Sequence, residues 1–121
     1  MDETLRKSLM FDFYGPLLTE RQQDIYEMYY AQDMSLGEIG EQLGISRQAV
    51  YDIIKRSSAQ LEEFEDKLGL LSKFLRQQMM LAQMEEQLQL LIECIEQRDV
   101  SQSLMIVAQI QELISKIRNE A

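Results

Sequence analysis

The residues of this chain best suited to recognition chemistry lie between positions 46 and 56, in a segment that begins Ser-Arg-Gln and ends Lys-Arg. Arginine can donate paired hydrogen bonds to guanine, and glutamine can pair with adenine, from the first turn of a helix in the major groove. Basic side chains farther along such a helix contact phosphates. We therefore expect a nucleic-acid-binding surface made of Ser46, Arg47, Gln48, Tyr51, Lys55 and Arg56.

These side chains need a helix that presents them, and residues 35–56 have the pattern of a helix-turn-helix. Ser35 begins a capping box, S-x-x-E, which opens the first helix. Gly44 can adopt the left-handed conformation that ends this helix, and Ser46 then caps the second. Gly40 lies four residues before Gly44, where a missing side chain would let the two helix backbones approach closely.

The second of these helices has one apolar face. Its members are Val50, Ile53, Ile54 and Ser57, so the candidate residues fall on or beside the opposite face. A solvated polar face on an ordinary amphipathic helix would give the same pattern. The helix-turn-helix signature directly before it favours the nucleic-acid interpretation.

The charge of this region indicates weak rather than strong binding. Residues 19–59 hold four basic side chains against seven acidic ones, so one copy can neutralise few phosphates. Asp52 lies on the expected reading face, where it would repel a phosphate or accept from the amino group of cytosine. Two copies acting together would recover affinity through effective concentration.

The whole chain is acidic, with 21 Asp and Glu against 12 Lys and Arg among its 121 residues. It has no histidine and one cysteine, Cys94, which excludes an intrachain disulfide and disfavours a zinc site. Neither a glycine-rich phosphate loop nor a nucleophile with a histidine base is present, so we expect no metal, no cofactor and no enzymatic activity. The chain has no signal-peptide pattern and no stretch that could span a bilayer, so we expect a cytoplasmic protein without membrane insertion.

The chain shows no strand-like alternation longer than a few residues, so we expect an all-α fold. Leu5, Leu9 and Phe13, with Met10 alongside, form an apolar stripe on a first helix, which must end before Pro16. We expect Phe11, Phe13 and Tyr14 to pack in the core against the next helices. A T-x-x-Q capping box at Thr19 then begins a helix that extends to about residue 31.

The helix that follows Ser46 has no breaker before Gly69 and is expected to continue to that point. An acidic cluster near its end is interpreted as a solvated helix face. Its members are Glu62, Glu63, Glu65 and Asp66. We expect two domains, an N-terminal helix with the helix-turn-helix head in residues 1–69 and a C-terminal dimerisation or partner segment in residues 70–121.

The C-terminal segment has the pattern of a helical hairpin. Its first helix, residues 70–98, carries a seven-residue apolar repeat made of Phe74, Leu81, Met84, Leu88, Leu91 and Ile95. After a break at Arg98-Asp99, the last helix carries Ile106, Ile110, Leu113 and Ile117, with Val107 and Ile114 beside them. Because a two-helix hairpin buries only one side of each stripe, we expect a homodimer in which these helices pair with a second copy.

Two resemblances rest on these motifs. The segment LTERQQDIYEMYYAQDMSLGEIGEQLGISRQAVYDIIKR resembles the promoter-reading fourth region of bacterial sigma factors. That resemblance implies a major-groove role for Arg47, Gln48 and Tyr51. It implies a backbone role for Lys55 and Arg56. The stretch FDFYGPLLTERQ followed by SLGEIGEQLGISRQAVYDIIKR, on a chain of this length, resembles more closely the YlxM family of small bacterial proteins.

The chain departs from sigma factors because Gly40 stands where alanine is usual and because the polymerase-binding regions are missing, so it is not a sigma factor. The YlxM resemblance implies a DNA-binding regulatory protein of the signal recognition particle pathway, because the family's gene lies beside those of the particle's GTPases. Two functions therefore remain open. One is a dimeric regulator that reads DNA, and the other is a helical interaction protein that binds signal recognition particle RNA or protein instead of DNA. A third interpretation assigns all partner binding to the C-terminal helices.

Overall fold

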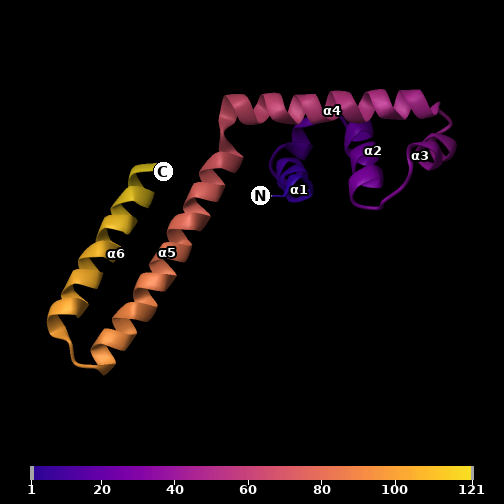
Figure 1. Ribbon diagram of the computed structural model, residues 1–121. Helices are drawn as coiled ribbons and strands as arrows, with labels where there is room; N and C mark the ends of the chain where they lie inside the picture. The colour runs from indigo at the N-terminus through magenta and orange to yellow at the C-terminus, as the bar shows by residue number, and fades with distance from the viewer. Residues whose placement is uncertain (1, 121) are drawn as a thin grey trace. The chain divides into compact units, whose positions relative to one another are not determined.

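The computed structural model describes residues 2–120, and every regular element in this range is a helix (Figure 1). The elements are α1 (Glu3–Tyr14), the 3₁₀ turn η1 (Gly15–Leu17), α2 (Glu20–Tyr30), α3 (Leu36–Leu43), α4 (Arg47–Leu68), α5 (Leu70–Glu96) and α6 (Val100–Glu120). The all-α expectation is confirmed. Contacts divide the chain into two units, residues 1–71 and residues 72–121. No helix in the described range is long and apolar enough to cross a membrane.

The first unit contains the predicted helix-turn-helix, formed by α3 and α4, with α2 packed against both. Its core consists of Ile25 from α2, Ile39 from α3, and Val50 and Ile54 from α4. None of these four side chains is more than 7% exposed. The apolar positions predicted for each helix therefore meet in one cluster, and their burial stabilises the arrangement of the three helices.

Side-chain caps begin these helices where the sequence predicts. Thr19 and Ser35 each form a complete capping box, which satisfies amide groups that the helix leaves unpaired. The Ser46 hydroxyl oxygen accepts a hydrogen bond from the amide of Ala49 at 3.0 Å. Gly44 ends α3 with a φ of 71°, a left-handed conformation that glycine adopts without steric cost.

Gly40 sets the distance between α3 and the turn that follows it. A Cβ atom on Gly40 would lie 2.6 Å from the carbonyl oxygen of Ile45 and 3.4 Å from the carbonyl carbon of Ser46. The Ile45 amide also donates a hydrogen bond to the Gly40 carbonyl oxygen at 3.0 Å. Because both contacts are with backbone atoms, a side chain at this position would force the turn away from α3. The close approach predicted from the sequence is confirmed.

α1 packs through the Met10 edge of the predicted stripe. Met10 and Tyr14 are the buried side chains, whereas Leu5 is 52% exposed and Leu9 and Phe13 are half-buried. The buried pair lies about 100° around the helix from Leu9 and Phe13. The hydroxyl group of Tyr14 has its hydrogen-bond partners inside the unit.

The interpretation of Glu65 as part of a solvated acidic face is wrong. Glu65 is 8% exposed, and its carboxylate accepts hydrogen bonds from the Tyr14 hydroxyl at 2.6 Å and the Leu71 amide at 2.9 Å. The Tyr14 oxygen accepts from the Leu70 amide at 2.9 Å. These bonds satisfy the first amides of α5, directly after Gly69 ends α4 with a φ of 63°. Burial and the hydrogen bond to Glu65 raise the pKa of Tyr14.

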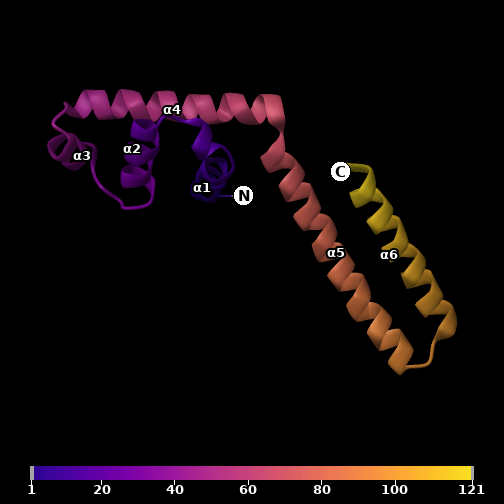
Figure 2. The same ribbon diagram turned by 180° about the vertical axis from the view of Figure 1, so that it is seen from behind.

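In the second unit, α5 and α6 lie side by side and antiparallel in both views (Figures 1 and 2). Arg98 has a φ of 61° in their connection. Asp99 caps α6 by accepting a hydrogen bond from the Gln102 amide at 3.0 Å. An ion pair of 3.2 Å joins Arg76 to Glu120. The predicted hairpin is confirmed.

The two helices of the hairpin use only part of their apolar repeats against each other. The more enclosed positions of α5 are Gln77, Met80, Met84, Gln87, Leu91 and Cys94. Those of α6 are Ser103, Ile106, Ile110, Leu113 and Ile117. Three members of the predicted α5 repeat are exposed instead, namely Leu81, Leu88 and Ile95, at 45%, 46% and 59%. Met84 and Leu91 of that repeat thus face α6, whereas Leu81, Leu88 and Ile95 face outward.

The backbone contact of Gly40 predicts a large stability difference between two glycines of the same helix. Gly40→Ala should lower the free energy of unfolding by about 1–3 kcal/mol, because the turn must move. Gly37→Ala is the matched control, since its Cβ would meet nothing closer than the Ser35 hydroxyl oxygen at 3.9 Å. It should leave stability unchanged or raise it by up to about 1 kcal/mol. Urea unfolding of the full chain measures both, and equal stability of the two variants would contradict this account.

The buried carboxylate of Glu65 predicts a second difference in stability, between variants of two neighbouring residues on α4. Glu65→Ala leaves the Tyr14 hydroxyl and the Leu71 amide without an acceptor, so it should cost about 1–3 kcal/mol. Asp66→Ala removes an exposed carboxylate and should change stability by less than about 0.5 kcal/mol. Thermal unfolding of both variants, followed by circular dichroism, tests this. A loss no larger for Glu65→Ala than for Asp66→Ala would show that the network contributes nothing.

Candidate nucleic-acid interface

The packing of α4 fixes which of its side chains face outward. Val50, Ile54, Ser57 and Leu61 are all buried and recur every three or four residues, so they hold one face of the helix against the unit. The buried Ser57 hydroxyl donates to the carbonyl oxygen of Ile53 at 2.7 Å, which satisfies it without a partner from another helix. The predicted site residues therefore lie on the exposed part of α4.

Three of the predicted residues lie together near the start of α4. Arg47, Gln48 and Tyr51 line one open groove, and Leu36 at the start of α3 completes it. The Tyr51 side chain is 46% exposed. In a helix-turn-helix, the N-terminal turns of the second helix contact base edges. The groove thus combines donors, an aromatic ring and an apolar contact at the part of the helix that could read sequence.

Two polar side chains of this group already have partners. Gln48 Nε2 donates to Asp52 Oδ1 at 3.0 Å, which leaves its second amide proton and its carbonyl oxygen available. The Ser46 oxygen is used in the helix cap with Ala49, so its hydroxyl proton is what remains to donate. Both side chains are therefore oriented before any ligand binds.

A groove on the other edge of α4 adds a residue that the sequence analysis did not select. Arg56 lines it together with Arg21 of α2, next to Thr19 and Gln60. Gln22 Nε2 donates to Gln60 Oε1 at 2.7 Å, which holds α2 and α4 together at this point. Arg21 is far from Arg56 in the sequence, and only the packing of α2 on α4 places both in one groove. Periodicity within single helices carries no signal for such a pair.

The cations of the first unit fall into two groups. Outside residues 19–59 each has a partner: Arg6 pairs with Glu62, Lys67 with Glu63 at 3.3 Å, and Lys7 with the Tyr30 hydroxyl at 3.1 Å. Within residues 19–59 the cations are Arg21, Arg47, Lys55 and Arg56, and none of them forms an ion pair with a described carboxylate. Of the five cations of this unit that form no ion pair with a described carboxylate, four thus lie on the helix-turn-helix and α2, and the fifth, Lys7, donates to a tyrosine hydroxyl.

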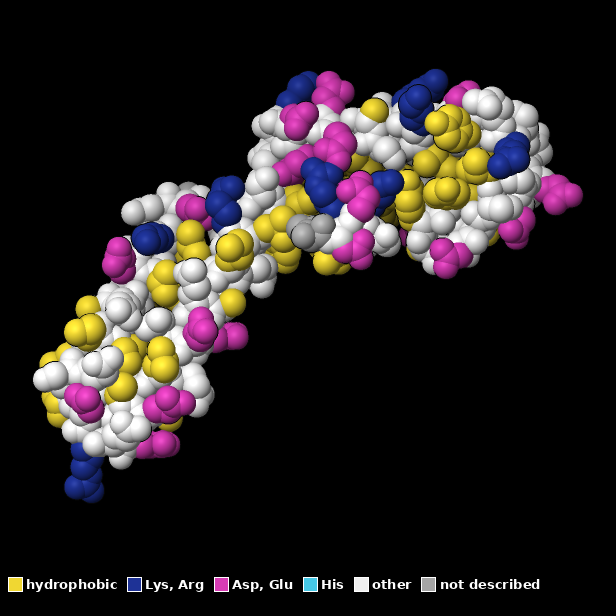
Figure 3. Space-filling view, viewed as in Figure 1, with side chains coloured by type: hydrophobic (Ala, Val, Ile, Leu, Met, Phe, Trp, Pro, Cys, Tyr) yellow, Lys and Arg dark blue, Asp and Glu magenta, His cyan; other side chains and the backbone are white. Residues whose placement is uncertain are grey.

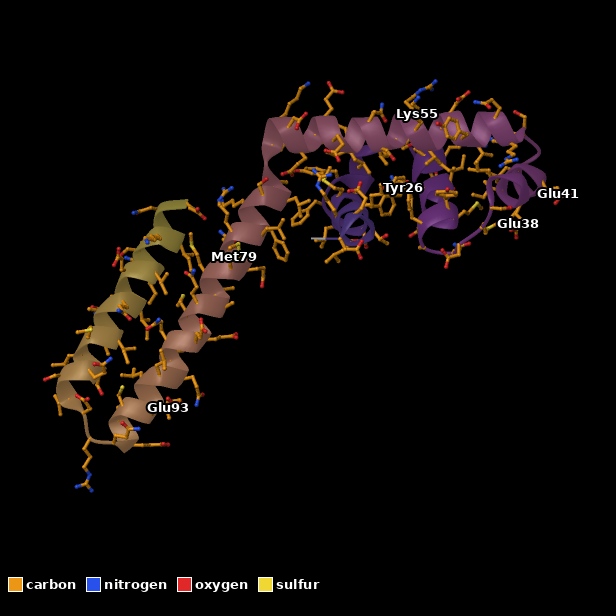
Figure 4. The ribbon with its side chains drawn as sticks, in the orientation of Figure 1. Tyr26, Glu38, Glu41, Lys55, Met79 and Glu93 are labelled. Atoms are coloured by element: carbon orange, nitrogen blue, oxygen red, sulfur yellow. The ribbon has the colours of Figure 1, made fainter. Side chains whose placement is uncertain are left out.

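The acidic side chains of α3 are separated from this surface. Figure 4 shows Lys55 projecting from the outer side of α4, whereas Glu38 and Glu41 project from α3 away from that side. Glu38 is also held in its capping box, where it accepts from the Ser35 amide at 3.2 Å. Asp52 is the single acid between Arg47 and Arg56. Residues 47–56 of α4, with three basic side chains against one acidic side chain, thus carry positive charge although the unit is acidic.

The exposed part of α4 has groups that are suited to binding. Between residues 2 and 120, no group of three or more His, Cys, Asp or Glu side chains could hold a metal ion. The exposed α4 surface instead offers hydrogen-bond donors and cations at its two edges. Such groups recognise phosphates and base edges.

Comparison with known proteins agrees with the helix-turn-helix. Residues 1–100 match the model of the UPF0122 family, described as "Putative helix-turn-helix protein, YlxM / p13 like". A UPF0122 protein of Halalkalibacterium halodurans is 54% identical over 86 residues, which cover 71% of this chain and 79% of the relative. A UPF0122 protein of Bacillus thuringiensis is 50% identical over 86 residues, covering 71% and 78%. The chain therefore belongs to the UPF0122 family of YlxM/p13-like helix-turn-helix proteins.

Proposed function

We propose that this protein is a regulator that binds duplex DNA by placing the exposed face of α4 in the major groove. The observation that carries the proposal is the distribution of ion pairs. The four cations of residues 19–59 have no carboxylate partner among the described residues, whereas the other cations of this unit are engaged. Charge that the protein leaves unpaired on one surface is available to phosphates.

The geometry supports a division of labour along α4. Arg47, Gln48 and Tyr51 would contact base edges, since they share the groove at its first turns. Lys55 and Arg56 would contact phosphates. Arg21 of α2, Thr19 and the hydroxyl proton of Ser46 would add contacts to the DNA backbone. With these assignments, the first turns of α4 would contact bases, and the residues on either side would contact phosphates and fix the orientation of the helix on the DNA.

A single head should bind weakly, because residues 19–59 have a net charge of −3. We therefore propose a homodimer, with residues 1–69 as the reading head and residues 70–121 as the dimerisation segment. Linking two heads converts the second binding event into an intramolecular one, and affinity rises without any new contact. The exposed apolar residues of α5 and α6 support this role.

The acidic head also supports a second proposal, in which the partner belongs to the signal recognition particle pathway. Residues 1–71 hold 14 acidic and seven basic side chains, and this balance suits a protein partner or a structured RNA as well as it suits DNA. Both proposals place the protein in the cytoplasm. The two proposals predict different nucleic acids in material that co-purifies with the protein from cells. Bound DNA would be digested by DNase, and bound particle RNA would be digested by RNase.

Sequence preference is the property that Arg47 should control. With a duplex selected by the full chain from a random pool, Arg47→Ala should weaken binding about 5- to 150-fold and relax the preferred sequence. Fluorescence anisotropy at fixed salt measures this. The matched control on the same helix is Lys67→Ala, whose ammonium is paired with Glu63, and it should bind like the native chain. Equal affinity of the native protein for selected and random duplexes would refute DNA reading, and competition by RNA alone would favour the second proposal.

A further inference from the structure

The hairpin of α5 and α6 does not bury enough of its own apolar surface to form a core. In residues 72–120, Ile106 is the one side chain that is fully buried, at 4% exposed. Gln87 lies between the helices with its Oε1 buried and without a hydrogen-bond partner, which costs about 1–3 kcal/mol. A two-helix unit of this kind needs a further surface against which to pack.

Six of the apolar side chains that remain exposed on the hairpin form two regular rows. Leu81, Leu88 and Ile95 follow at seven-residue intervals on α5, and Val100, Val107 and Ile114 do so on α6. These six side chains are between 37% and 69% exposed. Figure 3 shows yellow side chains exposed along both helices of the hairpin. Spacing of seven residues is typical of a helix that contacts other helices along its whole length.

Both rows lie on the same side of the hairpin. The other side is a polar groove lined by Gln83, Glu86, Gln109, Glu112 and Lys116. Each apolar row lies roughly half a turn from these groove residues around its own helix. Exposed apolar side chains are therefore more numerous on the side of the two rows, which we call the apolar hairpin face and define by the six residues of the rows. On the groove side the exposed large apolar side chains are Met79, Leu90 and Met105.

We propose that the apolar hairpin face packs against the same face of a second copy of this chain, so that two hairpins form a four-helix bundle. The inference deepens the dimer of the proposed function and rests on that part of it, but it is independent of DNA binding. In such an interface one patch meets its own copy around a two-fold axis. Alternation of hydrophobic rows with polar outer surfaces is the pattern of four-helix bundles.

Charge favours a second copy over a strongly charged partner. Residues 72–121 hold seven acidic and five basic side chains, whereas residues 1–71 hold 14 and seven. The hairpin is thus the nearly neutral part of an acidic protein, where two copies can approach with little repulsion. None of the six residues that define the face is charged, and Glu85, which is exposed and lies between Leu81 and Leu88 along α5, is a carboxylate beside this row.

The exposed area also matches what a dimer needs. Six large apolar residues at these exposures, with Ile92 and Leu104 beside them, present several hundred Å² of apolar surface, in the range of large patches that often have a function. A standard interface buries about 800 Å² on each partner, and a little over half of that area is apolar. Each face therefore supplies about the apolar part of an interface of ordinary size.

The oligomeric state of the full chain without DNA tests this inference, so that its failure is separate from a failure to bind DNA. Light scattering at micromolar concentration should give a dimer mass for the native chain. Leu88→Glu and Val107→Glu should each give a monomer, or raise the dimer dissociation constant at least about tenfold. The matched controls are Gln83→Glu and Gln109→Glu on the polar groove, which add the same charge and should leave the dimer intact.

If a glutamate variant loses helix by circular dichroism, Leu88→Ala with Val107→Ala replaces it, since alanine keeps the helix while removing most of the contact. A native chain that stays monomeric would overturn the inference. A dimer that tolerates glutamate at Leu88 and Val107 but dissociates with glutamate at Gln83 would overturn it equally, because the interface would then lie on the other side.

Discussion

The contact between Gly40 and the backbone of Ile45 is the constraint on which the proposed recognition surface depends. The distance of 2.6 Å that a Cβ would have from the Ile45 oxygen leaves no room for any side chain. α3 therefore lies directly against the turn, and α4 must leave the turn in one direction. Ile39, Val50 and Ile54 then close the core, and their burial prevents α4 from rotating. The exposed face of α4 is thus a consequence of packing on its other side.

The starts of α2, α3 and α4 and the ends of α3 and α4 were predictable from sequence because the responsible interactions are local. Ser35 and Thr19 cap helices with residues three positions away, and Gly44 and Gly69 end helices through their own φ angles. The exposure of Arg47, Gln48 and Tyr51 was likewise predictable, because it follows from the apolar periodicity of a single helix. Such signals need no knowledge of which helices meet.

Other features could not be predicted because they depend on distant residues. Glu65 resembles its acidic neighbours in sequence, and only the approach of Tyr14 buries it. Arg21 joins Arg56 only after α2 has packed on α4. The apolar repeat of α5 does not reveal which of its members face α6, since a single stripe can be divided between two neighbours. In each case the missing information is the identity of the contacting element.

An acidic composition is compatible with a helix-turn-helix because the positive charges that lack an ion-pair partner are grouped in one part of the chain. Arg6, Lys7 and Lys67 are engaged inside the unit, while the cations around α4 stay unpaired, so a protein with a net charge of −9 can still present a positive surface. The acidic remainder would limit non-specific binding. Affinity would then depend on base contacts and on the joining of two heads, which connects the recognition helix to the hairpin.

The most direct test of this account is an NMR titration of the isotopically labelled full chain with a short DNA duplex at low salt. The account predicts that the amide signals of Arg47, Gln48 and Arg56 shift, and that the guanidinium signals of Arg21, Arg47 and Arg56 shift as well. The amide signals of Glu38, Glu41 and α6 should not shift. Shifts confined to α1 or to the hairpin, or no shifts at low salt, would contradict the assignment of α4 as the surface that meets DNA.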